Sequence, residues 1–311
     1  MRWYYIVAAL GVLMLFVTAF FSYKLFVFAF SRTRKEQVNV GGTPWDEFLD
    51  EIEQARGWLR AQTSKSVFIE SEDGISLHGR LITSENAKNT MLLMHGYRSS
   101  DSFFDFSCAA KMYHDMGFNL LFADQRAHGE SGGKYICFGV KERFDCLRWV
   151  KYINSVFGEE KGVFLDGISM GASTVLMASG LQLPPNVRGI VADCGYTSPW
   201  AEFSHIAKTI IKIPKFPVLY VVDIMSRVLA GFGLKDYSTL DALKTNKIPI
   251  LFAHGQCDNF VPPCMTEENY RACTGEKYIV RSKKGKHGTS YLCDRGEYQK
   301  ALDDFVQRYS V

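Results

Sequence analysis

The sequence lacks the features that mark nucleic-acid-binding proteins and many metalloproteins. Its 311 residues carry a net charge of only +3, and no lysine- or arginine-rich block gathers that charge, so we expect no nucleic-acid partner. Neither a zinc-finger spacing nor a phosphate-binding P-loop occurs, and repeats and low-complexity tracts are also missing. The composition is otherwise ordinary, and the length allows one large domain or two small ones with a sizeable core.

Cysteine is present, but without a pattern. The paired spacings typical of zinc sites or of small disulfide scaffolds are missing. Reduced thiols in a protein core explain the distribution better, and they favour a compartment in which disulfides do not form. The cysteines lie at irregular spacing, mostly inside apolar runs: Cys108, Cys137, Cys146, Cys194, Cys257, Cys264, Cys273 and Cys293.

Charge is missing altogether from Trp3 to Tyr23. A helix of about 21 residues is about 30 Å long, the thickness of the hydrocarbon core of a bilayer. Aromatic residues lie near both ends, as in helices that meet the membrane interface. We therefore predict a membrane anchor over residues 1–31. A cleaved signal peptide is the alternative, because Val27-Phe28-Ala29 loosely fits a cleavage site, although the apolar region is long for one.

The charges on either side of the predicted anchor suggest its orientation. Arg2 and the amino terminus precede it, whereas Lys24, Arg32, Arg34 and Lys35 lie at its other end. The positive-inside rule then places the rest of the chain in the cytoplasm. The unpatterned cysteines point to the same side.

Residues 32–63 form a predicted connector. Gly41-Gly42 interrupts the chain there, and Thr43-Pro44 fits the start of a helix, with proline at the first helical position. Apolar residues then recur at three- and four-residue spacing as far as Leu59, which indicates an amphipathic helix. Because its polar face is acidic, we expect this helix to pack on the domain instead of lying on lipid.

From residue 64 the pattern changes to that of an α/β domain, which we expect over residues 64–311. Two alternating stretches surround Asp73-Gly74 and predict a hairpin. Short apolar runs, typical of buried strands, then alternate with helical stretches, which predicts a mostly parallel sheet with helices on both faces. The predicted strands are 66–70, 75–82, 91–94, 118–123, 162–168, 187–193, 248–253 and 278–281, and the main predicted helices are 102–116, 139–157 and 295–308.

Residues 197–246 interrupt this alternation. They contain several prolines and apolar helical stretches at 206–211 and 218–229, and they are too long and too apolar for a plain loop. We interpret them as a helical cap over the functional site.

The motif Gly167-Ile168-Ser169-Met170-Gly171 follows the apolar run Val163–Leu165. Gly-x-Ser-x-Gly between a buried strand and a helix indicates a nucleophile elbow, in which the glycines leave room for a tight turn that presents the serine hydroxyl. The first turn of the following helix directs N–H groups to the same place, where an oxyanion would form. The motif alone is weak evidence, since a serine at this position can simply cap a helix.

A serine nucleophile needs a base, and the base needs a carboxylate that orients it. His287 lies in a glycine-flanked loop after the last predicted strand, where it can reach a residue on another strand. Asp258 lies in the loop after the preceding strand, and Asp193 is the alternative acid. We predict Ser169, Asp258 and His287 as the catalytic residues. The competing interpretations are a solvated histidine in a basic loop and an aspartate in an Asx turn.

The backbone amides of Tyr97 and Met170 are the predicted donors of the oxyanion hole. His95-Gly96-Tyr97 follows the predicted strand 91–94, so the Tyr97 backbone can turn an N–H inward, and Met170 begins the helix after the serine. We expect His95 to shape this loop instead of acting as a base.

Together these segments resemble the α/β-hydrolase superfamily in order and spacing, from about residue 64 to the C-terminus. Within the superfamily the chain is similar to bacterial lysophospholipase-like and cinnamoyl-esterase-like serine hydrolases, an impression to which Ala192–Ser198 and the small cap contribute. Ala127 is a departure, because relatives usually have glycine there, and we expect a slightly altered loop; His128 is structural in most relatives. The segments that carry the resemblance are His95-Gly96, Asp124–Gly132, Gly167–Gly171, His254–Asp258 and Lys286–Gly288.

The resemblance implies a serine hydrolase that cleaves esters or thioesters through an acyl-enzyme, with no metal and no organic cofactor. A serine nucleophile argues against dehalogenase and epoxide hydrolase chemistry, which use an aspartate at that position. The predicted anchor and the apolar cap favour a small-molecule or lipid ester as substrate. A serine peptidase or an acyltransferase with the same triad, and a non-catalytic membrane-tethered binding domain, are the alternatives. The sequence does not predict an oligomeric state.

Overall fold

A computed structural model describes residues 3–32, 43–99 and 102–310. Arg2, Arg34, Lys35 and Gly41-Gly42, which entered the predictions on orientation and on the connector, lie outside the described residues.

One mixed sheet of eight strands forms the centre of the domain, in the order β1-β2-β4-β3-β5-β6-β7-β8. β1 and β2 form the predicted antiparallel hairpin, and β2 pairs antiparallel with β4. From β4 to β8 all neighbouring strands run parallel, so their carboxyl ends share one edge. The strands are β1 (Ser64–Glu70), β2 (Ser76–Ile82), β3 (Asn89–Met94), β4 (Phe118–Ala123), β5 (Gly162–Ile168), β6 (Val187–Asp193), β7 (Ile250–Gly255) and β8 (Lys277–Ser282).

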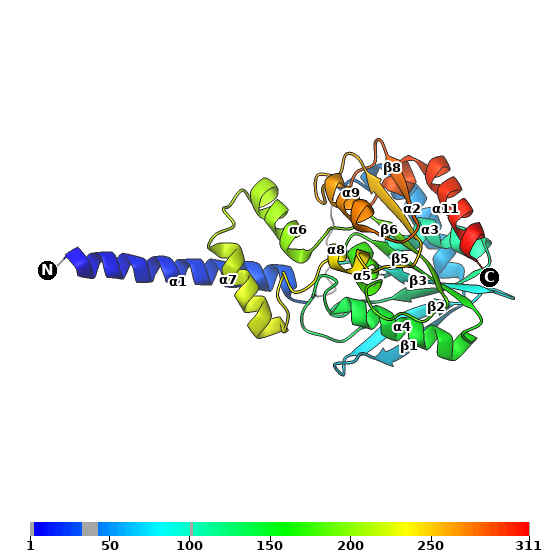
Figure 1. Cartoon of the computed structure of the whole chain (residues 1–311), viewed down its shortest axis with the longest axis horizontal. Coiled ribbons are helices and arrows are strands. Elements are labelled where there is room, and N and C mark those ends of the chain that lie inside the picture. Colours follow the sequence, from blue (N-terminus) through cyan, green and yellow to red (C-terminus); the bar gives the residue numbers. More distant parts are fainter. Residues whose placement is uncertain (1–2, 33–42, 100–101, 311) are drawn as a thin grey trace.

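Helices cover both faces of this sheet, as predicted (Figure 1). One face carries α4 (Glu142–Phe157), α5 (Met170–Ala178), α8 (Thr239–Leu243) and α9 (Pro263–Ala272), and the other carries α2 (Leu49–Ala61), α3 (Ser102–Asp115) and α11 (Arg295–Tyr309), with the short α10 (Ser290–Cys293) before it. β3 and β4 are buried along their whole length, because strands covered on both faces have no solvent side.

Two predicted helix starts are wrong, each for a local reason. α4 begins at Glu142 instead of residue 139, because the Glu142 carboxylate accepts hydrogen bonds from the amides of Cys137 and Gly139 and closes a turn before the helix. The connector helix α2 begins at Leu49 after a 3₁₀ turn (Asp46–Phe48), and the Thr43 hydroxyl donates to the Asp46 carboxylate instead of capping the helix.

α1 (Trp3–Phe30) projects from the domain along most of its length (Figure 1). It is long and apolar enough to cross a bilayer, a property that a signal sequence shares. Its last turns are not free, because Phe26, Ala29 and Phe30 are buried in a cluster with residues of the cap.

Residues 197–246 contain three helices. Ser198 caps α6 (Pro199–Ile206) by accepting a hydrogen bond from the Ala201 amide, and α6 continues as a π-helical turn (Ala207–Ile211). α7 (Val218–Met225) packs beside α1 and also continues as a π-helical turn (Ser226–Ala230). α8 completes the segment, which we call the cap, and returns the chain to the sheet (Figure 1).

Candidate active site

Ser169 lies in the sharp turn between β5 and α5. Its φ of 57° and ψ of −113° are strained for a residue with a side chain. A Cβ at position 171 would overlap the carbonyl oxygen of Met94, and one at position 167 would overlap the backbone of Gly171. Both positions therefore require glycine, and the turn holds the Ser169 hydroxyl at the carboxyl edge of the sheet.

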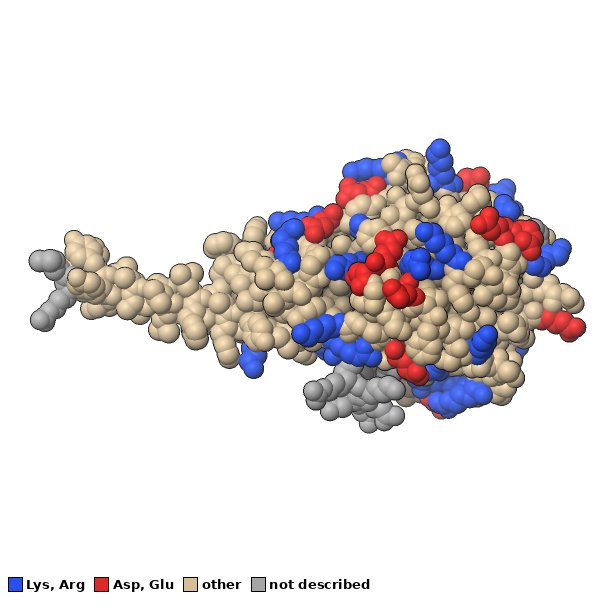
Figure 2. Space-filling model, turned by 90° about the horizontal axis from the view of Figure 1, so that it is seen from below, with Lys and Arg blue, Asp and Glu red and all other residues tan. Residues whose placement is uncertain are grey.

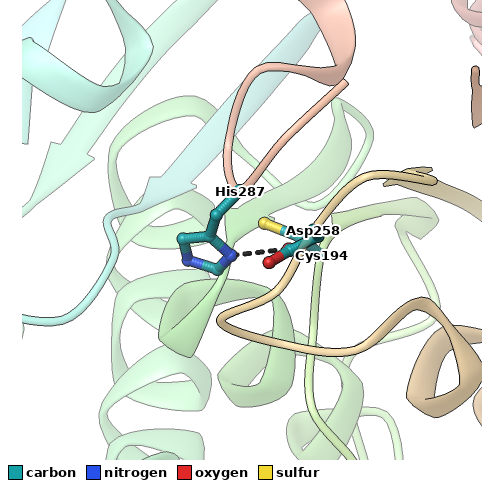
Figure 3. A group of neighbouring side chains, drawn as sticks. All are labelled: Cys194, Asp258 and His287. Carbon is teal, nitrogen blue, oxygen red and sulfur yellow. Dashed lines mark hydrogen bonds and ion pairs between the residues drawn. The ribbon is translucent and has the colours of Figure 1, made fainter. Parts of the chain in front are cut away.

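The structure brings Ser169, His287 and Asp258 together from the loops that follow β5, β8 and β7. The Nε2 atom of His287 lies 2.9 Å from the Ser169 Oγ, and its Nδ1 atom lies 2.7 Å from a carboxylate oxygen of Asp258. Figure 3 shows His287 and Asp258 facing each other from two separate loops. The three side chains thus form one continuous line of hydrogen bonds, as nucleophilic catalysis by serine requires.

Asp258 is held in its charged form by several donors. The amides of Phe260 and Val261 donate to Oδ1 at 2.8 and 3.0 Å. Burial on its own would raise the pKa of Asp258, but hydrogen bonds with His254 and His287 outweigh it and keep that pKa well below its usual range. The alternative acid, Asp193, accepts a hydrogen bond from Ser290 and none from His287. The geometry therefore supports Asp258 over Asp193 as the partner of His287.

The two amides predicted for the oxyanion hole lie next to this line. Met170 is the first residue of α5, and Tyr97 follows β3, which pairs with β5 so that Met94 is opposite Gly167. Neither amide donates a hydrogen bond within the described part of the chain. Both N–H groups therefore remain available for an oxygen beside Ser169.

The neighbouring histidines bond the backbone. His95 accepts from the Gln125 amide at 3.0 Å, and His128 accepts from the Arg98 amide at 3.1 Å. Ala127 is buried at a φ of 62°, a conformation that glycine would adopt without strain. These residues shape the loops around the site, and none of them touches Ser169 or His287 through a hydrogen bond.

Comparison with known proteins identifies the fold. No family model matches the chain. A Bacillus subtilis (strain 168) protein described as uncharacterized, YqkD, is 26% identical over 246 residues, or 79% of this chain and 80% of YqkD. The structure of the Pyrococcus furiosus esterase Pf2001 matches at a TM-score of 0.66 and 22% identity, covering 88% of this chain and 96% of the esterase. The α/β hydrolase GrgF from Penicillium sp. sh18 matches at 0.60 and 14% identity, over 80% and 99%.

The chain has the α/β-hydrolase fold. At these identities the solved structures establish the architecture alone. A Pyrococcus horikoshii acylaminoacyl peptidase has the same fold, with a TM-score of 0.59, 16% identity, and coverage of 82% of this chain and 43% of the peptidase.

Two residues that the sequence analysis gave no role contact the site of this α/β-hydrolase fold. His254 is buried, with Nε2 at 3.1 Å from the Asp258 carboxylate and Nδ1 at 2.6 Å from the Thr266 hydroxyl. Trp45 of the connector donates from Nε1 to the backbone carbonyl of His287 at 3.1 Å, a contact between residues 242 positions apart. The His254–Asp258 spacing was visible in the sequence, whereas nothing there pointed to Trp45.

Cys194 lies beside Asp258 and His287, and these three side chains could in principle hold a metal ion (Figure 3). A thiolate is the form that binds metal, but burial and the charges of Asp193 and Asp258 raise the pKa of Cys194 well above its usual range. Both ring nitrogens of His287 already make hydrogen bonds, to Ser169 and Asp258. His287 and Asp258 therefore fit the line of hydrogen bonds with Ser169 better than they fit a metal site, and we assign no metal to this group of side chains.

Glu202, a buried carboxyl group on α6, also lies near the site, although no motif in the sequence pointed to it. Neither of its carboxyl oxygens has a hydrogen-bond partner among the described residues. Burial, with a further contribution from the negative charge of Asp258, raises the pKa of Glu202 to about 8. At neutral pH the cap therefore holds a protonated carboxyl group close to the site.

Proposed function

We propose that this chain is a membrane-bound serine hydrolase that cleaves carboxylic esters or thioesters. The observation that carries the proposal is the line of hydrogen bonds from Ser169 through His287 to Asp258, at 2.9 and 2.7 Å. Ser169 lies on the strained elbow of an α/β-hydrolase fold, the position from which a serine attacks a substrate carbonyl.

In the proposed reaction the Ser169 Oγ attacks the ester carbonyl and His287 Nε2 accepts the hydroxyl proton. Asp258 holds the Nδ1–H tautomer and stabilises the imidazolium, while the amides of Tyr97 and Met170 donate to the oxyanion. Collapse of the tetrahedral intermediate releases the alcohol or thiol, which takes its proton from His287. Water then attacks the acyl-enzyme with His287 as base, and the carboxylic acid leaves.

The anchor proposal rests on how α1 ends. Cleavage of a signal peptide after Ala29 would remove Phe26 and leave Phe30 at a chain end, although both are buried against the cap. Lys24 would also interrupt the apolar region of a signal peptide. A helix that stays attached keeps this packing, so we propose α1 as a single membrane-spanning anchor.

A membrane position favours a lipid ester, such as a lysophospholipid or an acylglycerol, as the substrate. Ser169 is only 6% exposed, so an acyl chain would have to enter beneath the cap. The lysophospholipase-like resemblance of the sequence agrees with this class of substrate.

The test uses the full chain in detergent, assayed on p-nitrophenyl esters of increasing acyl length. We expect Ser169→Ala to lower turnover by roughly 10⁴-fold or more, because removal of a serine nucleophile leaves only binding and oxyanion stabilisation. The same variant should lose fluorophosphonate labelling. Ser155→Ala, which changes an exposed serine of α4, is the matched control and should keep both. A folded Ser169→Ala protein that retains turnover or labelling would contradict the proposal.

A further inference from the structure

The cap carries an unusual number of large apolar side chains at its surface. They lie on α7, on the π-helical turns that follow α6 and α7, and on the loop before α7, and Phe216 and Val228 are 71% and 76% exposed. Side chains of this kind seldom gather on a surface that faces water. We call them the apolar face of the cap; its members are Ile210, Ile211, Phe216, Tyr220, Ile224, Val228 and Leu229.

The packing of α1 fixes the position of the cap along the proposed anchor. Thr18, Ser22 and Phe26 follow one stripe of α1 that is less exposed than the rest, and the Ser22 hydroxyl donates to the Val218 carbonyl of α7 at 3.4 Å. The uncharged stretch of α1 extends to Tyr23. The cap therefore overlaps the end of this stretch by about five residues, or about 8 Å along the helix. Interfacial helices reach a similar depth in a bilayer, about 5–10 Å.

The charge around the apolar face suits an anionic lipid surface. Lys208, Lys212 and Lys215 are exposed there, whereas the exposed Arg227 forms ion pairs with Asp223 and Asp236. Asp223 is the single acidic residue between positions 207 and 229, and its carboxylate is occupied by Arg227 and by the Leu234 amide. Apolar side chains bordered by lysine and arginine are typical of segments that lie in the headgroup layer.

The part of α1 that projects beyond the cap shows no blue or red side chain in Figure 2, whereas lysine, arginine and acidic side chains are scattered over the body of the domain. A lipid surface that surrounds α1 would therefore meet the cap first. The apolar face adjoins α1, so both can contact one bilayer, whereas a protein partner would have to compete with that bilayer for the same face.

α6 links this face to the site. His205, in the last turn of α6, lies 3.2 Å from the Asn259 carbonyl, next to Asp258, and the π-helical turn that follows directly carries Ile210 and Ile211. A segment that touches both the headgroup layer and the Asp258 loop is suited to admit a substrate from the membrane.

We infer that the cap lies in the headgroup layer of an anionic bilayer, the same bilayer that α1 spans, so that the ester enters the site from the membrane. The inference rests on the proposed anchor and deepens the proposed function. The apolar face is then a second membrane contact, separate from α1.

Photocrosslinking to lipid tests the position of the cap without any measurement of turnover. p-Benzoylphenylalanine would replace Leu13 of α1, Phe216 of the cap or Phe68 of β1, each of which is more than half exposed. The full chain would be reconstituted in vesicles of phosphatidylcholine and phosphatidylglycerol, irradiated, and examined by mass spectrometry for phospholipid adducts. We expect adducts at Leu13 and Phe216, with a yield at Phe216 about tenfold above that at the matched control Phe68.

The adduct yields at the three positions distinguish failure of the inference from failure of the anchor proposal. Adducts at Leu13, together with an adduct yield at Phe216 no higher than that at Phe68, would overturn the inference and leave the anchor proposal intact. No adducts at Leu13 would overturn the anchor and the inference together. Crosslinks from Phe216 to a second copy of the chain would assign the apolar face to a dimer instead of a bilayer.

A charge substitution tests the consequence for substrate entry. Val228→Glu should lower turnover of an ester dissolved in the vesicles about tenfold, because a carboxylate disfavours contact with the anionic surface. The rate on water-soluble p-nitrophenyl acetate should stay unchanged, which shows that the variant is folded and active. Val156→Glu, at an exposed valine of α4, is the matched control. Equal rates for the two variants on the vesicle ester would contradict entry from the membrane.

Discussion

Single buried residues decide which groups near the site carry charge. Asp258 keeps its negative charge because hydrogen bonds from two histidines and two amides replace the water that burial removes. Glu202 lies in the cap, on α6, without any such donor among the described residues, and it keeps its proton instead. The two carboxyl groups thus differ in charge at neutral pH because of their partners.

This difference gives Glu202→Gln a pH-dependent effect on stability. The pKa of Glu202 is raised from 4.5 to about 8 in the folded protein. Between these values the unfolded chain has released a proton that the folded protein retains, so this group makes the free energy of unfolding fall as the pH rises. Glutamine cannot ionise, and we expect the variant to be more stable than the original protein at pH 8 by on the order of a few kcal/mol, with little difference near pH 4.

Thermal unfolding of the detergent-solubilised full chain at the two pH values measures this effect. Asp166, whose pKa burial raises to about 7, titrates in the same range, so only the difference between variant and original protein is informative. Glu159→Gln, at an exposed glutamate of the loop before β5, should show no such difference. A stability gain for Glu202→Gln that is the same at both pH values would contradict the assigned pKa.

Among the elements, α1 is both a proposed anchor and part of the packing of the cap. Phe30 is fully buried, with its ring stacked 5.3 Å from that of Phe203 on α6 and edge-on at 5.1 Å to Phe138. We expect Phe30→Ala to weaken the docking of the cap by about 3–5 kcal/mol, the usual cost of removing a buried phenylalanine ring. Hydrogen exchange of the α6 amides in the full chain measures the loss as faster exchange.

Phe16→Ala is the matched control for that substitution, because Phe16 lies on the same helix and is 69% exposed. It should leave α6 exchange unchanged. Equal hydrogen-exchange rates of the α6 amides in Phe30→Ala and Phe16→Ala would show that α1 does not hold the cap in place.

The sequence predicted the elements that depend on a local pattern, but it did not predict contacts between residues that are far apart in the chain. The alternation of short apolar runs and helical stretches predicted the parallel sheet, and glycines at 167 and 171 predicted a turn that only glycine allows. α1 is apolar on nearly all sides, and Thr18 and Ser22, four residues apart, are too weak a pattern to predict from the sequence which face packs against α7. The Trp45 contact with His287 depends on how the connector crosses the domain, and the residue pattern within one helix cannot predict such a contact.

On the scale of the whole molecule, the carboxyl edge of the sheet, the cap and the end of α1 lie on one side of the domain (Figure 1). Ser169 and His287 are on that edge, and Tyr97 bonds the Ala29 carbonyl through its hydroxyl at 2.9 Å. The proposed oxyanion loop is therefore in direct contact with the proposed anchor. If α1 is the proposed anchor, the site therefore faces the bilayer instead of the bulk solvent.

The same arrangement bears on which side of the membrane the domain occupies. Arg32 bonds the carbonyls of Gly129 and Ser131 and so stays close to the end of α1, and the lysines of the cap add positive charge on this side. Because positive charge is retained in the cytoplasm, we expect the domain to be cytoplasmic.

Cys257 and Cys264 are exposed free thiols. In intact cells that express the full chain, a membrane-impermeant maleimide should label them only after permeabilisation, and a variant with both changed to serine should then be labelled more weakly. Labelling in intact cells that equals the labelling in permeabilised cells would place the domain outside the cytoplasm.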